Sequence, residues 1–173
     1  MAGTPELLTL KRNRDLERWR RPLWRQVGIV LLLVVAVAGL ANVFGQRPET
    51  VRAATPAAVI SVYAPARVRG GLYYEARIHI TARRELKNAT VVLGSGWAEG
   101  MTINTIEPSP LGQASRNGRL ALQLGHIPAG QSFTLFMQLQ VNPTNVGRRE
   151  QDVELDDGPT RIAFLDRTIT IFP

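Results

Sequence analysis

The feature that most constrains this chain is an uncharged apolar run over residues 27–44, which reads VGIVLLLVVAVAGLANVF. In an α-helix these eighteen residues extend roughly 27 Å, which is close to the hydrocarbon thickness of a bilayer. A helix also satisfies every backbone polar group of a segment that crosses lipid. We therefore predict a single transmembrane α-helix over 27–44.

Basic residues are concentrated before this run. Residues 1–26 carry seven Lys or Arg against three Asp or Glu, whereas 13 basic residues are nearly balanced by 10 acidic ones from residue 51 onward. The positive-inside rule then places the tail 1–26 in the cytoplasm and the C-terminal part on the extracytoplasmic side of the cell membrane. The residues expected to set this topology are Arg18, Arg20, Arg21 and Arg25, with Trp19 and Trp24 as interfacial anchors.

The same charge distribution indicates what the chain contacts. A basic tail next to a membrane span is attracted to anionic lipid headgroups. The nearly balanced charge of the remainder does not fit a nucleic-acid-binding domain, which carries a basic patch. We expect an integral, single-span protein with anionic lipid at its tail and no nucleic acid as a partner.

Two other interpretations of the N-terminal region stay open. A cleaved signal peptide would use the small residues at 36–38, although the apolar run is longer than the usual 7–15-residue core of such a signal. The pair Arg20-Arg21 also has the spelling of a twin-arginine export signal. A paired arginine before a span is equally what the positive-inside rule produces, so we favour the uncleaved anchor.

Beyond the span the hydrophobic pattern changes to that of strands. Residues 45–57 contain Pro48 and Pro56 without apolar periodicity and are predicted to form a linker. From residue 58, apolar and polar residues alternate with a period of two in short segments separated by turn residues. The predicted strands are 58–64, 73–82, 89–93, 101–106, 120–124, 132–141, 149–155 and 160–172, the last as one bent strand or two.

This pattern predicts an all-β fold for residues 58–173, an antiparallel β-sandwich that follows the single transmembrane helix. One apolar and one polar face per strand is typical of two sheets packed face to face. The strand pattern and the segment 125–132, GHIPAGQS, before the long strand resemble the immunoglobulin-like modules of bacterial extracytoplasmic proteins. The resemblance implies an immunoglobulin-like sandwich and no particular activity.

Catalytic chemistry is not indicated by the residues. The chain has no cysteine and only two histidines, His79 and His126, neither of which belongs to a recognisable catalytic or metal-binding motif. We expect a protein that is not an enzyme and that has no catalytic residue, metal or cofactor.

Two sequence features are candidates for an interface. Glu150, Asp152, Glu154 and Asp156 alternate along a predicted strand and would form an acidic row on one face. Such a row meets a basic partner or calcium, or it is a solvated face whose charge Arg161 or Arg167 offsets. Phe136, on the polar face of its strand, and Trp97, in a glycine-containing loop, are candidate exposed interface residues.

We therefore expect a protein that presents a β-sandwich to the extracytoplasmic side and binds or positions a protein partner there. It would be an accessory subunit of a membrane complex or envelope assembly. The alternative is a module that binds an envelope glycan or calcium through the acidic row.

Overall fold

The structure is a computed structural model that describes residues 23–43 and 45–173. The chain divides into two compact units, Met1–Phe44 and Gly45–Pro173. Four of the residues predicted to set the membrane topology, Arg18, Trp19, Arg20 and Arg21, lie outside the described residues.

The first unit contains the helix α2 (Leu23–Leu40), whose residues are almost all apolar and none of which is buried. Its 18 residues are long and apolar enough to cross a membrane. The helix begins and ends four residues earlier than the predicted span 27–44. It ends where Asn42 adopts a left-handed backbone conformation, with φ of 52°, and the Val43 amide donates to the Ala38 carbonyl.

The second unit is made of strands. These are β1 (Pro48–Ala54), β2 (Ala58–Pro65), β3 (Arg67–Arg69), β4 (Tyr73–Ala82), β5 (Leu86–Leu93), β6 (Met101–Glu107), β7 (Gly112–Arg116), β8 (Arg119–Ile127), β9 (Ser132–Val141), β10 (Gly147–Glu150), β11 (Val153–Asp157), β12 (Thr160–Leu165) and β13 (Thr168–Phe172). A short 3-10 helix, η2 (Ser95–Trp97), follows β5.

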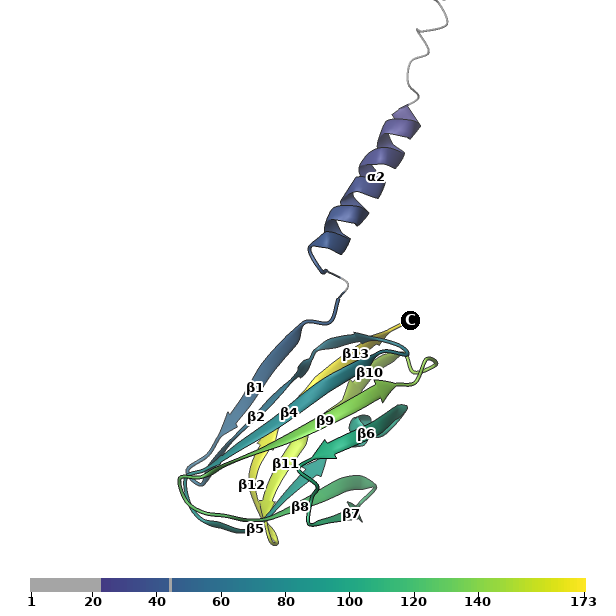
Figure 1. Ribbon diagram of the computed structural model, residues 1–173. Coiled ribbons are helices and arrows are strands. Elements are labelled where there is room, and N and C mark those ends of the chain that lie inside the picture. Colours follow the sequence, from purple (N-terminus) through teal and green to yellow (C-terminus); the bar gives the residue numbers. More distant parts are fainter. Residues whose placement is uncertain (1–22, 44) are drawn as a thin grey trace, which may run out of the picture. The chain divides into compact units, whose positions relative to one another are not determined.

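The strands form three sheets (Figure 1). We call the sheet with the order β1-β2-β4-β9-β6 the front sheet, the sheet β12-β11-β5-β8-β7 the back sheet, and the sheet β10-β13-β3 the small sheet. All pairings are antiparallel except that of β13 with β3. The predicted fold class, an all-β antiparallel sandwich preceded by one apolar helix, is confirmed.

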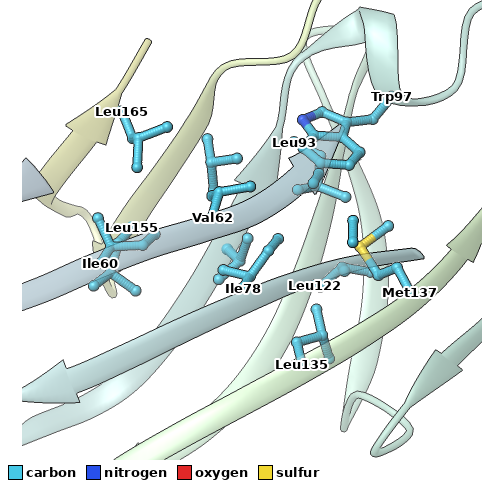
Figure 2. Close-up of a cluster of buried hydrophobic side chains, with 14 of the residues drawn as sticks. Ile60, Val62, Ile78, Leu93, Trp97, Leu122, Leu135, Met137, Leu155 and Leu165 are labelled. Carbon is cyan, nitrogen blue, oxygen red and sulfur yellow. The ribbon is translucent and has the colours of Figure 1, made fainter. Parts of the chain in front are cut away.

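The core lies between the front and back sheets because alternate residues of each strand point inward. Along β4 every second side chain is buried, which is the alternation expected from the sequence. Figure 2 shows Ile60 and Ile78 of the front sheet in one cluster with Leu93, Leu122 and Leu155 of the back sheet. All five side chains are fully buried.

The predicted linker 45–57 is wrong over most of its length, because residues Pro48–Ala54 form β1 and pair with β2. Val51 and Ala53 are partly buried against the core, a weak alternation that Arg52 and the two prolines obscure in the sequence. Pro48 is tolerated because it is the first residue of an edge strand, where the missing N–H breaks no interior ladder. The short strands β3 and β7 were also not predicted.

The predicted strand 149–155 is two strands in different sheets. For 160–172, which is predicted as one bent strand or two, the second alternative is confirmed, because β12 and β13 are separate strands. The chain leaves the small sheet after β10 and enters the back sheet at β11, and it makes the reverse change between β12 and β13. The two crossings lie side by side, since the Gln151 amide donates to the Arg167 carbonyl at 2.7 Å. Residues 151–152 and 166–167 therefore interrupt what looks continuous in the sequence.

Candidate functional site

The outer face of the front sheet carries a row of aromatic and charged side chains. Tyr63 of β2 pairs with Arg77 of β4, which pairs with Phe136 of β9, which in turn pairs with Glu107 of the edge strand β6. The Arg77 guanidinium carbon lies 5.4 Å from the Tyr63 ring centroid and 5.5 Å from that of Phe136. Both distances fit cation–π contacts, so the arginine stacks between two exposed rings. We call Tyr63, Arg77 and Phe136 the aromatic row.

Arg77 is also held by a neighbouring carboxylate. Its Nε donates to Glu75, two residues earlier on the same face of β4. This hydrogen bond and the charge of Glu75 raise the pKa of Arg77 above its ordinary value. The ring contacts and the ion pair together fix a long side chain that would otherwise be mobile.

A groove of about 500 Å³ lies beside the aromatic row. Exposed Tyr73 and Phe136, the carboxylates of Glu75 and Glu107, and the amide of Gln138 line it. Among the described residues, Glu107 makes no salt bridge. Aromatic faces and carboxylates in one groove suit a cationic side chain with an apolar stem, such as lysine or arginine.

Phe136 lies on the outer face of β9, as predicted, and its side chain is 43% exposed. Its neighbours on that face include Thr134 and Gln138, which are polar as predicted. An interface role for Phe136 stays a prediction. The groove beside it was not predicted, since nothing in the sequence indicates that β4, β9 and β6 are adjacent.

The prediction that Trp97 is an exposed interface residue is wrong. Its side chain is 0% exposed and is part of the core cluster (Figure 2), with the indole Nε1 donating to the Asp152 carbonyl at 3.2 Å. The turn η2 brings the ring inward by passing close to the chain before β11. A Cβ on Gly96 would lie 2.2 Å from the Glu150 carbonyl oxygen, so only glycine permits this approach. The glycines that suggested an open loop are what allow the burial.

The four predicted acidic residues do not form one exposed row. Glu150 belongs to β10 in the small sheet, whereas Asp152, Glu154 and Asp156 lie in or next to β11 in the back sheet. Asp156 is almost fully buried, with 3% exposed. Charged side chains can protect an exposed edge strand from pairing with another chain, but β11 lies between β12 and β5 and is not an edge strand.

Two arginines that sequence reasoning overlooked neutralise the acids of the back sheet. Arg119 of β8 donates to Asp152 and, at 3.1 Å, to Glu154, and Arg116 of β7 donates to Asp156. The expected partner Arg161 lies 4.0 Å from Glu154, and Arg167 is in the interior. These ion pairs argue against calcium or glycan binding by the acidic row, because the carboxylates already have cationic partners.

Burial has a further effect on Asp156. Its desolvation and the nearby charge of Glu154 raise the pKa of Asp156 above the ordinary range, and Arg116 opposes the shift. One carboxylate oxygen of Asp156 is buried without a hydrogen bond from a described residue. In residues 23–43 and 45–173, no group of three or more His, Asp or Glu side chains is arranged to hold a metal ion.

A buried polar cluster that the sequence did not indicate lies at the two strand crossings. Arg167 is 3% exposed and donates to the Gln151 side chain and to the Pro65 carbonyl. Gln151 in turn donates to the Tyr74 hydroxyl at 2.8 Å, and this hydroxyl donates to the Met101 sulfur at 3.0 Å. Desolvation lowers the pKa of Arg167 and raises the pKa of Tyr74 to about 12. We call Tyr74, Gln151 and Arg167 the buried polar cluster.

The remaining predicted topology residues lie in α2. Trp24 and Arg25 are exposed in the first turns of the helix, as an interfacial position requires. The exposed histidines contact surface side chains, with His79 hydrogen-bonded to Thr134 and His126 to Glu85.

Comparison with known proteins gives similarity of fold and nothing more specific. No family model matches the chain, and a search of curated proteins found no significant match. One similar solved structure is the CARDB domain of the PF1109 protein from Pyrococcus furiosus, which was solved in complex with di-metal ions. It is 13% identical to this chain, with a TM-score of 0.40, and the match covers 73% of this chain and 96% of that one.

Two further structures are similar at the same level. The sporulation control protein Spo0M from Bacillus subtilis is 14% identical, with a TM-score of 0.39 over 69% of this chain and 51% of its own, so the match spans about half of that protein. The RrgA Jo.In complex is 11% identical, with a TM-score of 0.38 over 71% of this chain and 93% of its own. At these values we transfer no ligand, partner or activity to this chain.

Proposed function

We propose that this chain is a non-enzymatic, single-span membrane protein of a bacterial envelope whose β-sandwich binds a protein partner on the extracytoplasmic side. It acts as an accessory subunit that positions this partner at the membrane. The observation that carries the proposal is the aromatic row next to a groove that is lined by Glu107, on a domain that follows a helix able to span a bilayer.

The anchor is supported by two independent features. No residue of the helix α2 is buried within its own unit, so the apolar surface of the helix needs a surrounding medium such as lipid. The excess of basic residues in 1–26 supports an N-terminus in the cytoplasm and a sandwich outside it. A cleaved signal sequence would have the same apolar helix, but a shorter one.

The chemistry of the groove supports a basic partner segment. Tyr73 and Phe136 offer ring faces, and Glu107 offers a carboxylate that makes no salt bridge with a described residue. Glu75 lines the same concave surface, but its carboxylate is paired with Arg77. A lysine or arginine from a partner would place its apolar stem against the rings and its charge near Glu107, as Arg77 does between Tyr63, Phe136 and Glu75. Aromatic and arginine side chains are also the residues that most often dominate binding energy at protein interfaces.

The back sheet offers a matched control for Phe136. Phe164 of β12 is 46% exposed, against 43% for Phe136, and it also has an arginine over its ring, Arg161 at 5.8 Å. The two phenylalanines therefore share exposure and a cation–π partner, and they differ in the sheet on which they lie and in the neighbouring groove.

The test is site-specific photo-crosslinking in native membranes from position 136 or position 164 of the full-length protein. We expect one discrete crosslinked partner from 136 and none from 164. Phe136→Ala and Glu107→Gln should reduce co-purification of this partner by roughly tenfold or more, the effect of an interface hot spot, whereas Phe164→Ala should not. Equal crosslinking from both positions, or equal loss with both alanine variants, would contradict the assignment of the site.

A further inference from the structure

The outer face of the small sheet is basic. Arg148 of β10 pairs with Thr170 of β13, which pairs with Arg67 of β3, and two residues farther along the same face Arg69 pairs with Phe172. All three arginines are exposed, and none makes a salt bridge with another described residue. The Arg69 Nε donates to the Pro173 carbonyl oxygen at 2.9 Å. The acidic residue on this face is Glu150, at the far end of β10, opposite Thr168.

Exposed apolar side chains surround these arginines at one end of the sandwich. Leu72, Val146 and Phe172 are each 45% or 46% exposed. Leu72 and Phe172 are held near Arg69 by backbone hydrogen bonds, because the Leu72 amide donates to the Arg69 carbonyl at 3.2 Å and the Gly70 amide to the Phe172 carbonyl at 2.7 Å. Val146 directly precedes Gly147, which pairs with Ile171. We call Arg67, Arg69, Arg148, Leu72, Val146 and Phe172 the basic end.

The chain enters the sandwich at this same end. The Gln46 side chain donates to the Tyr73 carbonyl at 3.0 Å, and β1 starts at Pro48 opposite Pro65, two residues before β3. Figure 1 shows β1 beginning and β13 ending at one end of the sandwich. The helix α2 ends at Leu40, so residues 41–45 separate it from Gln46. Five residues extend no more than roughly 18 Å, so the segment that joins the helix to the sandwich is short.

We propose that the basic end docks on the surface of the bilayer, with its arginines on anionic lipid phosphates and its apolar side chains at the level of the headgroups. Arginine binds phosphate with planar, paired hydrogen bonds, and exposed apolar side chains next to basic ones favour the boundary between headgroups and acyl chains. The inference rests on the proposed anchor. Docking holds the sandwich at a fixed orientation, so that the aromatic row faces a partner at a defined height above the membrane.

The absence of cysteine from the sequence allows a clean depth measurement. Val146→Cys places a label at the basic end. Ala129→Cys is the matched control, because residue 129 lies in an exposed turn at the opposite end of the sandwich. The amide of the next residue, Gly130, donates to the carbonyl of Ala82, and Ala82 ends β4, whereas Tyr73 begins it. Ten strand residues separate these ends by about 30 Å. Both full-length variants are labelled with an environment-sensitive fluorophore and reconstituted into nanodiscs that contain nitroxide-bearing lipids.

In discs of phosphatidylcholine with phosphatidylglycerol, we expect quenching at position 146 to exceed quenching at position 129 by roughly twofold or more. High salt, or the triple variant Arg67→Gln, Arg69→Gln, Arg148→Gln, should remove most of this difference, because the attraction to phosphate is screened or lost. The corresponding triple lysine variant keeps the charge and should retain the difference.

Equal quenching at the two positions, or a difference that survives loss of the three arginines, would overturn the proposal. An acidic protein as the true occupant is recognised by a triple glutamine variant that loses a co-purifying chain while the quenching stays unchanged, which also overturns it. Failure of the anchor is distinguishable, because the protein would then not co-elute with the discs.

Discussion

Gln151 connects the buried Arg167 to Tyr74, and replacing Gln151 with leucine tests whether the buried polar cluster stabilises the sandwich. The residue is 0% exposed, accepts a hydrogen bond from Arg167 and donates one to the Tyr74 hydroxyl. Leucine has a similar volume, so the substitution removes these hydrogen bonds without leaving a large cavity. The Nε of Arg167 already lacks a hydrogen-bond partner among the described residues, which leaves little capacity to compensate.

The expected cost follows from the groups left unpaired. A hydrogen bond to a charged group contributes about 1.5–3 kcal/mol, and one to a neutral hydroxyl about 0.5–1.5 kcal/mol. We therefore expect Gln151→Leu to lower the free energy of unfolding by about 2–4 kcal/mol. Adding Arg167→Met removes the stranded cation, so the double variant should be more stable than the sum of the single effects by about 0.5–3 kcal/mol.

The assay is urea-induced unfolding of the full-length protein in detergent micelles, followed by circular dichroism of the strands. Gln138→Leu, on the exposed outer face of β9, serves as the matched control and should change the free energy of unfolding by no more than about 0.5 kcal/mol. A Gln151→Leu variant as stable as this control, or a double variant that shows only additive losses, would refute the role given to the buried polar cluster.

Two further predictions concern pH. Because burial raises the pKa of Tyr74 from 10.0 to about 12, stability is fully present below pH 10 and should fall by about 1.4 kcal/mol per pH unit between the two values. Tyr74→Phe should remove this part of the alkaline loss in denaturation curves, and an unchanged slope would contradict it. The raised pKa of Asp156 means that the folded state favours the protonated carboxyl, so the free energy of unfolding should fall as pH rises from about 4. Asp156→Asn cannot ionise and should reduce this fall between acidic and neutral pH. The same decline in both proteins would show that another group causes it.

The sequence is sufficient for the strands that have one buried face. Strand β9 was predicted with its observed bounds and β4 likewise, because their alternation is uninterrupted over ten residues each. Strand β1 is not predicted because its inward residues are only Val51 and Ala53. The segment 149–155 is predicted as one strand although it spans β10 and β11, because a crossing between two sheets does not change the hydrophobic period.

The candidate sites were less predictable, since they depend on which strands are neighbours. Phe136 was identified from its place on a polar face, but its contact with Arg77 requires knowing that β9 pairs with β4. The burial of Trp97 and the pairing of Arg119 with Asp152 are contacts over 33 residues or more in sequence, which local pattern does not encode. A buried arginine is especially hard to foresee, because arginine is almost always exposed.

The most direct test of the proposed function is the isolation of the full-length protein from its native membrane in mild detergent, followed by native sizing and identification of co-purifying chains. We expect the protein to stay in the membrane fraction until detergent is added and then to elute with one stoichiometric partner. That partner should dissociate in the Phe136→Ala variant and remain with Phe164→Ala. A lone monomer, or release of the wild-type protein without detergent, would contradict the account.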